Sequence, residues 1–168
     1  YDPLNGNWLF TLTDVPSGTA AYGPNGEILR YVLNVAGKWL GLWNNTCEQQ
    51  GLHGALGTSS SAYQWRPIGK TVNMSKAYSW NVTIPSLPGL ASPAIIKVIP
   101  DDLVFGRSTT FATMAGYENP AFYTLWAISL KPASRGQLLW IKNYTAPAGN
   151  LTLYQEIVDP ETRVFTMW

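Results

Sequence analysis

The chain reads Tyr123-Thr124-Leu125-Trp126-Ala127-Ile128-Ser129-Leu130 and, after a short polar link, Arg135-Gly136-Gln137-Leu138-Leu139-Trp140. Both runs are rich in β-branched, aromatic and aliphatic residues, and turn residues separate them, which is typical of two paired strands. Glycine adopts a positive φ without strain, so Gly136 suits the turn between two strands of one sheet. The stretch therefore predicts a strand, a turn and a second strand that carries a tryptophan.

A tryptophan-bearing strand recurs along the chain at Trp8, Trp80 and Trp140, each time before a link that contains proline. The first two tryptophans are 72 residues apart, and the second and third are 60 apart. Two strands separated by an acidic or Asn-Gly turn follow each link, and a further strand follows in the two complete copies. Four strands in each unit are typical of β-propeller blades.

The predicted fold class is therefore all-β, a partial β-propeller with about two full four-stranded blades plus two half blades. The expected strands span residues 8–13, 19–22, 27–34, 38–44, 77–84, 94–99, 103–106, 109–115, 122–130, 137–144, 151–158 and 163–168. Residues 1–16 would hold the last strand of one blade, 17–86 and 87–147 one blade each, and 148–168 the first two strands of the next. The alternative is a β-sandwich of about a dozen strands.

Residues 123–140 resemble the quinoprotein-type repeat, whose pattern is roughly lyAlD…tG…lW, and residues 2–10 resemble its second half. Together with five glycosylation motifs and long loops, the pattern is similar to that of secreted, archaeal quinoprotein-like (PQQ-like) propellers. The resemblance implies a propeller fold. The tryptophan after the turn glycine is expected to pack between adjacent sheets, so Trp8, Trp80 and Trp140 are interpreted as structural.

The clearest functional signal is glycosylation. Five Asn-x-Ser/Thr motifs, more than chance predicts, begin at Asn44, Asn73, Asn81, Asn143 and Asn150, and none has proline in the middle position. They indicate an exported protein that carries N-linked glycans, located outside the cell or on its surface. Asn81 and Asn143 lie in or just after tryptophan-bearing strands, and their side chains are expected to point to solvent on the outer strand of a blade.

Composition excludes several classes of protein. Hydrophobic residues make up 46% of the 168 residues and aromatic residues 13%, which is too much for a disordered chain. The net charge of +1 provides no electrostatic surface for nucleic acid. The longest apolar runs, such as residues 94–99, are much shorter than a membrane-spanning helix requires, so no transmembrane segment is expected.

The candidates for chemistry are few. Cys47 and His53 are the only cysteine and the only histidine, which excludes an internal disulfide and a four-ligand zinc site of Cys/His type. A long loop at residues 54–61, with Cys47, His53, Tyr63 and Trp65 around it, is the best candidate for a binding surface. The carboxylates Asp101, Asp102, Asp159 and Glu161 occupy equivalent inter-strand turns, which indicates turn formation rather than a metal site.

These patterns predict a non-catalytic scaffold with no cofactor. One alternative is a PQQ-dependent dehydrogenase, which would need bound Ca²⁺; no position of this chain matches such a site residue by residue. Another is a subunit of an extracellular filament or surface layer, in which strand edges add to neighbouring subunits. We also expect the native chain to be longer than residues 1–168, or a neighbouring chain to supply the missing strands. Residues 1–168 alone would then be insoluble or oligomeric, whereas a stable monomer would favour the sandwich.

Overall fold

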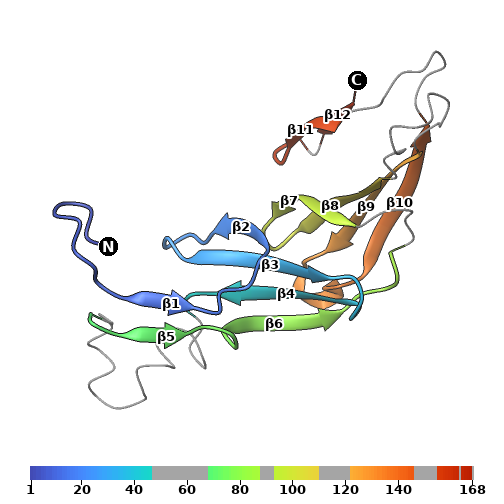
Figure 1. The fold of residues 1–168 in the computed structure, drawn as a ribbon. Coiled ribbons are helices and arrows are strands. Elements are labelled where there is room, and N and C mark those ends of the chain that lie inside the picture. The colour runs from blue at the N-terminus through green and yellow to red at the C-terminus, as the bar shows by residue number, and fades with distance from the viewer. Residues whose placement is uncertain (47–67, 88–92, 110–121, 146–154, 163, 168) are drawn as a thin grey trace, which may run out of the picture. The chain divides into compact units, whose positions relative to one another are not determined.

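The computed structural model describes residues 1–46, 68–87, 93–109, 122–145, 155–162 and 164–167 (Figure 1). In this part of the chain all regular structure is β-strand apart from one short 3-10 turn at Pro132–Ser134, so the all-β prediction is confirmed. The strands are β1 Thr11–Thr13, β2 Thr19–Tyr22, β3 Ile28–Asn34, β4 Trp39–Asn44, β5 Thr71–Asn73, β6 Tyr78–Thr83, β7 Ala94–Ile99, β8 Leu103–Thr109, β9 Phe122–Ser129, β10 Leu138–Thr145, β11 Gln155–Asp159 and β12 Val164–Met167.

These strands form two four-stranded sheets and two smaller ones. The four-stranded sheets have the orders β2-β3-β4-β6 and β10-β9-β8-β7, so neighbouring strands follow one another along the chain except where β5 intervenes. Strands β11 and β12 form an antiparallel hairpin, and β1 pairs with β5. In the part of the chain that the structure describes, none of these sheets closes on itself. The chain divides into two compact units, residues 1–32 with 40–81, and residues 33–39 with 82–168.

In the first unit, a small core forms around Trp43, which packs with Val72, Met74 and Ala77. Trp43 and Met74 are fully buried, and the indole N–H of Trp43 donates a hydrogen bond to the Met74 carbonyl at 2.8 Å. The half-buried side chains of Leu12 and Tyr78 cover this cluster. The core thus brings residues from β1 and β5 together with Trp43 of β4.

The beginning of the chain differs from the expected blade strand. Strand β1 begins at Thr11 instead of Trp8, and it pairs with β5 in parallel, Thr11 opposite Thr71 and Thr13 opposite Asn73. Residues 2–7 form a turn instead, in which the Asp2 amide donates to the Asn7 carbonyl at 2.8 Å. Strand β5 was not expected, because three residues are too short to show the alternation that marks a strand.

In the second unit, the central strand β9 is buried along almost its whole described length. Every residue from Thr124 to Leu130 is buried, which explains why this stretch is a nearly continuous apolar run instead of an alternating one. The buried hydroxyl of Thr124 is satisfied by a hydrogen bond to Asn143 Oδ1 at 2.9 Å. Gly136 has φ of +87°, so it adopts the conformation expected for the turn before β10.

Gly106 lets two strands of this sheet pack closely. It lies opposite Trp126 in the pairing of β8 with β9, and a Cβ atom at position 106 would lie 2.1 Å from the indole ring. The indole lies over the glycine, and its N–H donates to the buried Ser108 hydroxyl at 3.2 Å. The tryptophan therefore fills the space that the missing side chain leaves.

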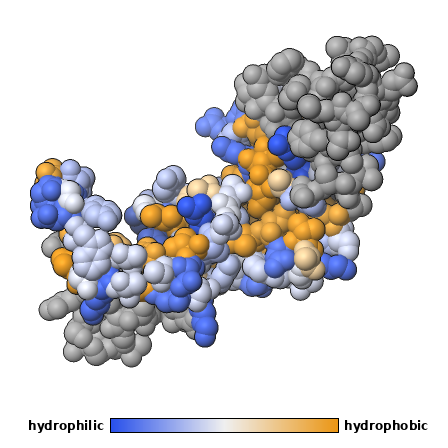
Figure 2. Space-filling model, in the orientation of Figure 1, coloured by the Kyte–Doolittle hydropathy of each residue, from blue (hydrophilic) through white to orange (hydrophobic). Residues whose placement is uncertain are grey.

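Hydrophobic residues also reach the surface of the described part of the chain in several places (Figure 2). The exposed large ones include Leu139 and Trp140 on β10, which are 49% and 37% exposed. No helix among the described residues is long and apolar enough to cross a membrane.

Candidate functional site

The three repeated tryptophans occupy three different environments. Trp140 in β10 stacks against Phe165 of β12 with ring centroids 6.5 Å apart and an interplanar angle of 18°. It therefore packs between two neighbouring sheets, as the sequence predicted for this position. Trp80 in β6 makes an edge contact with Tyr31 of its own sheet, with ring centroids 6.1 Å apart. Trp8 is 46% exposed, and its indole N–H donates to Thr11 Oγ1 at 2.9 Å.

Phe165 is the centre of this contact between sheets. Its ring lies 5.2 Å from Phe105 and 6.2 Å from Tyr144, besides the contact with Trp140. The Lys142 ammonium lies 5.4 Å from the centroid of the Tyr144 ring, which adds a cation–π contact beside the cluster. The sequence pattern marks Trp140 but not Phe165 as its partner, because a contact between distant strands leaves no local pattern.

Truncating Phe165 should loosen the hairpin β11–β12. Phe165→Ala removes one ring from contact with three others, and for this half-buried side chain we expect a loss of about 2 kcal/mol in unfolding free energy. Urea unfolding followed by circular dichroism would measure the loss. Val164→Ala, at the 55% exposed neighbouring position, is the matched control and should change stability by less than about 0.5 kcal/mol. Equal effects of the two substitutions would contradict the packing role of Phe165.

The turn carboxylates are held by their own turns. The Thr162 hydroxyl donates to Asp159 Oδ2, and the Glu161 amide donates to Oδ1 at 3.0 Å. These two bonds, the Thr162 bond first, hold the pKa of Asp159 below its ordinary value of 3.8 because they favour the charged form. Their contribution to the turn is thus present above pH 3.8 and is lost as the pH falls through the lower pKa of the folded state.

Glu27 closes the turn between β2 and β3 in a similar way. The Asn25 side chain donates to its carboxylate at 3.0 Å, and this bond is the main reason that the pKa of Glu27 lies below its ordinary value of 4.5. The Glu27 carbonyl also accepts a hydrogen bond from the Gly23 amide at 2.9 Å. This carboxylate, too, serves the turn that contains it.

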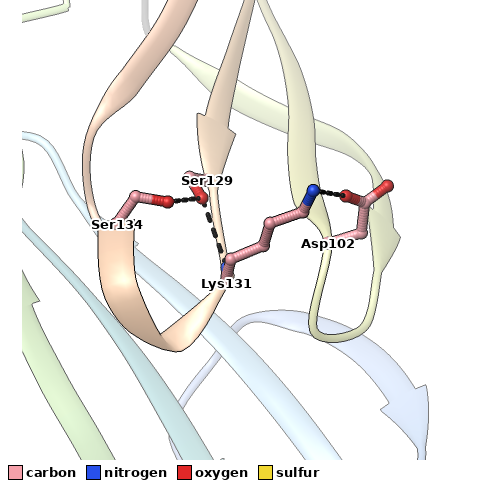
Figure 3. A network of polar contacts seen from close by, with 4 residues as sticks. All are labelled: Asp102, Ser129, Lys131 and Ser134. Carbon is pink, nitrogen blue, oxygen red and sulfur yellow. Dashed lines mark hydrogen bonds and ion pairs between the residues drawn. The ribbon is translucent and has the colours of Figure 1, made fainter.

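Asp101 and Asp102 form the turn between β7 and β8. Asp101 has φ of +57°, a conformation that Asp tolerates better than most residues. Asp102 Oδ1 lies 3.5 Å from Lys131 Nζ (Figure 3). The Asp102 carbonyl accepts from the Leu130 amide at 2.9 Å. These contacts join the β7–β8 turn to the end of β9, so Asp102 supports the structure of the sheet.

Ser129 links the same network to the turn before β10. Its hydroxyl lies 2.7 Å from the Ser134 hydroxyl and accepts from the Lys131 amide at 3.2 Å (Figure 3). Ser129 is buried, so these bonds satisfy a polar group that is shielded from water. The cluster is consistent with a structural role, as sequence analysis proposed for the turn carboxylates. No group of three or more His, Cys, Asp or Glu residues that could hold a metal ion occurs in the described ranges.

Two glycosylation motifs lie on the last strand of a four-stranded sheet. Asn81 is in β6 and Asn143 is in β10, and both side chains are exposed, as expected. Asn143 uses Oδ1 to accept the hydrogen bond from Thr124, which leaves Nδ2, the atom that carries an N-linked sugar, outside this bond. In a strand, residues two apart face the same side, so Asn81 shares its exposed face with Thr83 of the same motif.

Two other glycosylation motifs are less suited to carry a glycan. Asn44 ends the inner strand β4 and is half-buried, and its Oδ1 accepts from both the amide and the hydroxyl of Thr46 at 2.9 Å. Asn73 in β5 is exposed, but its Nδ2 donates to Asp14 Oδ2 at 2.6 Å. A glycan on Asn73 would therefore compete with a bond that the structure uses.

The remaining predicted site residues lie outside the described residues. They are Asn150 of the fifth motif, the loop at residues 54–61, and Cys47, His53, Tyr63 and Trp65 around it. Comparison of the chain with family models, curated proteins and solved structures gives no match.

Proposed function

We propose that this chain belongs to a non-catalytic secreted or cell-surface glycoprotein, in which propeller-type blades serve as a binding or structural scaffold. The proposal is carried by the repetition of a four-stranded sheet in which the last strand bears a tryptophan, Trp80 in β6 and Trp140 in β10. The hairpin β11–β12 follows with the next two strands in chain order, and its Phe165 packs on Trp140. Aromatic packing between successive sheets is how neighbouring blades of a propeller are joined.

Glycosylation supports the extracellular part of the proposal. Asn81 and Asn143 recur on the same strand of both sheets, with exposed side chains. An N-linked glycan requires export, and it must extend into solvent because it is bulky and polar. The Asp102 carboxylate pairs with Lys131, and the Asp159 carboxylate accepts hydrogen bonds from its own turn, which agrees with a scaffold.

Glycan mapping tests the proposal directly. In protein produced by its native source, we expect intact mass and peptide mapping to find glycans on at least two of the five motifs, including Asn81 and Asn143. Asn44 should carry the least, because its side chain is half-buried. Thr83→Ala, which removes the motif but keeps Asn81, should abolish the glycan on that residue alone. A protein of unmodified mass would overturn the proposal.

Fractionation and spectroscopy add two further tests. The native protein should be recovered from the medium or from the cell surface, and recovery inside the cell would contradict the proposed location. Bound Ca²⁺ together with a quinone absorbance in the purified native protein would support the dehydrogenase alternative instead. Regular polymers in electron micrographs would support the filament.

A further inference from the structure

The turn between β2 and β3 contains an exposed Asn-Gly pair. The turn spans residues 23–27 and reads GPNGE, in which residues 24–26 are exposed. The Gly26 amide donates to the Gly23 carbonyl at 3.0 Å, and the Gly23 amide donates to the Glu27 carbonyl at 2.9 Å, so two backbone bonds close the turn. Gly26 has φ of +85°, and a Cβ atom there would have no described atom within 4 Å. The space beside the Gly26 backbone is therefore open.

The Glu27 carboxylate holds the side chain of Asn25. Its Oε1 accepts a hydrogen bond from Asn25 Nδ2 at 3.0 Å, and its Oε2 accepts from the Asn25 amide at 3.0 Å. The carboxylate lies against Gly23, where a Cβ atom would collide with it. The turn thus fits an amide at position 25, and a carboxylate in its place would face Glu27.

An asparagine that precedes glycine can lose its amide group without an enzyme. The glycine amide nitrogen attacks Cγ of the asparagine, and an N–Cγ bond forms. The Cγ–Nδ2 bond breaks, and the nitrogen leaves as ammonia with the proton of the glycine amide. The cyclic imide then adds water and opens to aspartate or isoaspartate. Glycine favours this reaction because no side chain hinders the attacking nitrogen.

We propose that Asn25 is a self-modification site of this kind, that Glu27 slows the reaction while the turn is intact, and that the product opens the β2–β3 turn. Water is the only co-reactant, and the reaction does not depend on the proposed glycosylation. To reach the Gly26 nitrogen, the Asn25 side chain must leave Glu27, and the Gly26 amide must leave the Gly23 carbonyl. Each bond therefore lowers the fraction of turns that react.

The product has a structural consequence beyond position 25. Aspartate replaces the Nδ2 donor with a charged oxygen beside Glu27 Oε1, and like charges this close repel each other. Isoaspartate also adds a methylene group to the backbone, which changes the spacing of the bonds that close the turn. Ile28 follows the turn directly and exchanges two hydrogen bonds with Asn45, so we expect the chain just after β4 to loosen as well.

The sequence contains one other Asn-Gly pair, Asn5-Gly6, which provides an internal comparison. Asn5 Nδ2 donates to Asp2 Oδ2 at 2.8 Å, and Asn5 Oδ1 accepts from the Asn7 amide at 2.9 Å. Both ends of this side-chain amide are held, whereas among the described residues Asn25 is held only through Nδ2. We therefore expect Asn25 to react faster than Asn5.

Peptide mapping of the whole protein after incubation at neutral pH tests the proposal. Asn25 should convert to aspartate and isoaspartate faster than Asn5, and Asn7, which is exposed but precedes the bulky Trp8, should change least. Glu27→Ala releases the Asn25 amide and should speed its conversion about two- to tenfold, the factor that corresponds to the loss of one hydrogen bond. Conversion of Asn25 no faster than that of Asn5 or Asn7, or an unchanged rate in Glu27→Ala, would overturn the proposal.

Asn25→Asp tests the effect of the product separately. In this variant the pKa of Glu27 should rise above its ordinary value of 4.5, because a neighbouring negative charge disfavours the charged form. The amides of Gly26 and Ile28 should exchange with solvent faster as the turn opens. Asn25→Ser is the matched control, since it also removes the Nδ2 donor but adds no charge. NMR titration and hydrogen exchange measure both effects, and equal results for Asn25→Asp and Asn25→Ser would contradict the opening by charge.

Discussion

Gly106→Ala is expected to lower the free energy of unfolding of the second unit by about 3 kcal/mol, which is at the upper end for overpacked cores. The added methyl group would lie 2.1 Å from two carbon atoms of the Trp126 ring. The ring cannot move aside easily, because it is fully buried and its N–H is bonded to Ser108. The backbone cannot move aside easily either, because Gly106 pairs with β7 on one side and with β9 on the other.

Equilibrium urea unfolding followed by near-ultraviolet circular dichroism would measure this loss. Trp126→Leu provides the paired background, because removing the indole frees the space that the new methyl group needs. In that background Gly106→Ala should cost at least about 1 kcal/mol less than in the wild type, a coupling typical of residues in contact. Additive effects of the two substitutions would show that the indole does not lie over the glycine.

Trp43→Ala should destabilise the first unit by about 3–5 kcal/mol, the usual range for removing a large buried aromatic side chain. The indole is 1% exposed and packs against Val72, Met74 and Ala77. Trp43→Phe keeps part of this packing but leaves the Met74 carbonyl without its 2.8 Å hydrogen bond, so we expect a loss of about 1–3 kcal/mol.

Both variants lose the hydrogen bond of the indole, so the difference between their losses in thermal and urea unfolding gives the contribution of packing. Tyr22→Ala is the control, because this aromatic residue is 76% exposed and should matter by less than about 0.5 kcal/mol. A loss on Trp43→Ala as small as that of the control would mean that β4 and β5 do not share a core.

Local patterns predicted, at least in part, each described strand of four or more residues. The expected strands at 19–22 and 94–99 match β2 and β7, and the apolar run from Thr124 to Leu130 marks the buried β9. The expected strand at 109–115 meets the end of β8 at Thr109, and its remainder lies outside the described residues. Strand β5 could not be predicted, because its pairing with β1 depends on residues about sixty positions away.

In the candidate site, too, local features could be predicted, whereas features that depend on the arrangement of the strands and sheets could not. The motifs at Asn81 and Asn143 and the turn roles of Asp102 and Asp159 follow from the sequence, because a motif or a turn is local. The exposure that distinguishes Asn81 from Asn44 depends on which strands are at the edge of a sheet. The stacking of Trp140 on Phe165 likewise depends on the packing of one sheet on the next.

The parallel pairing of β1 with β5 has a consequence for the order of folding. Its partners, such as Thr11 and Thr71, are far apart in the chain, whereas β2 and β3 are joined by a tight turn. Closing a long loop costs more entropy than closing a hairpin, and only three residue pairs offset that cost here. The hairpins should therefore form early, and the pairing of β1 with β5 should be among the last contacts of the first unit to form.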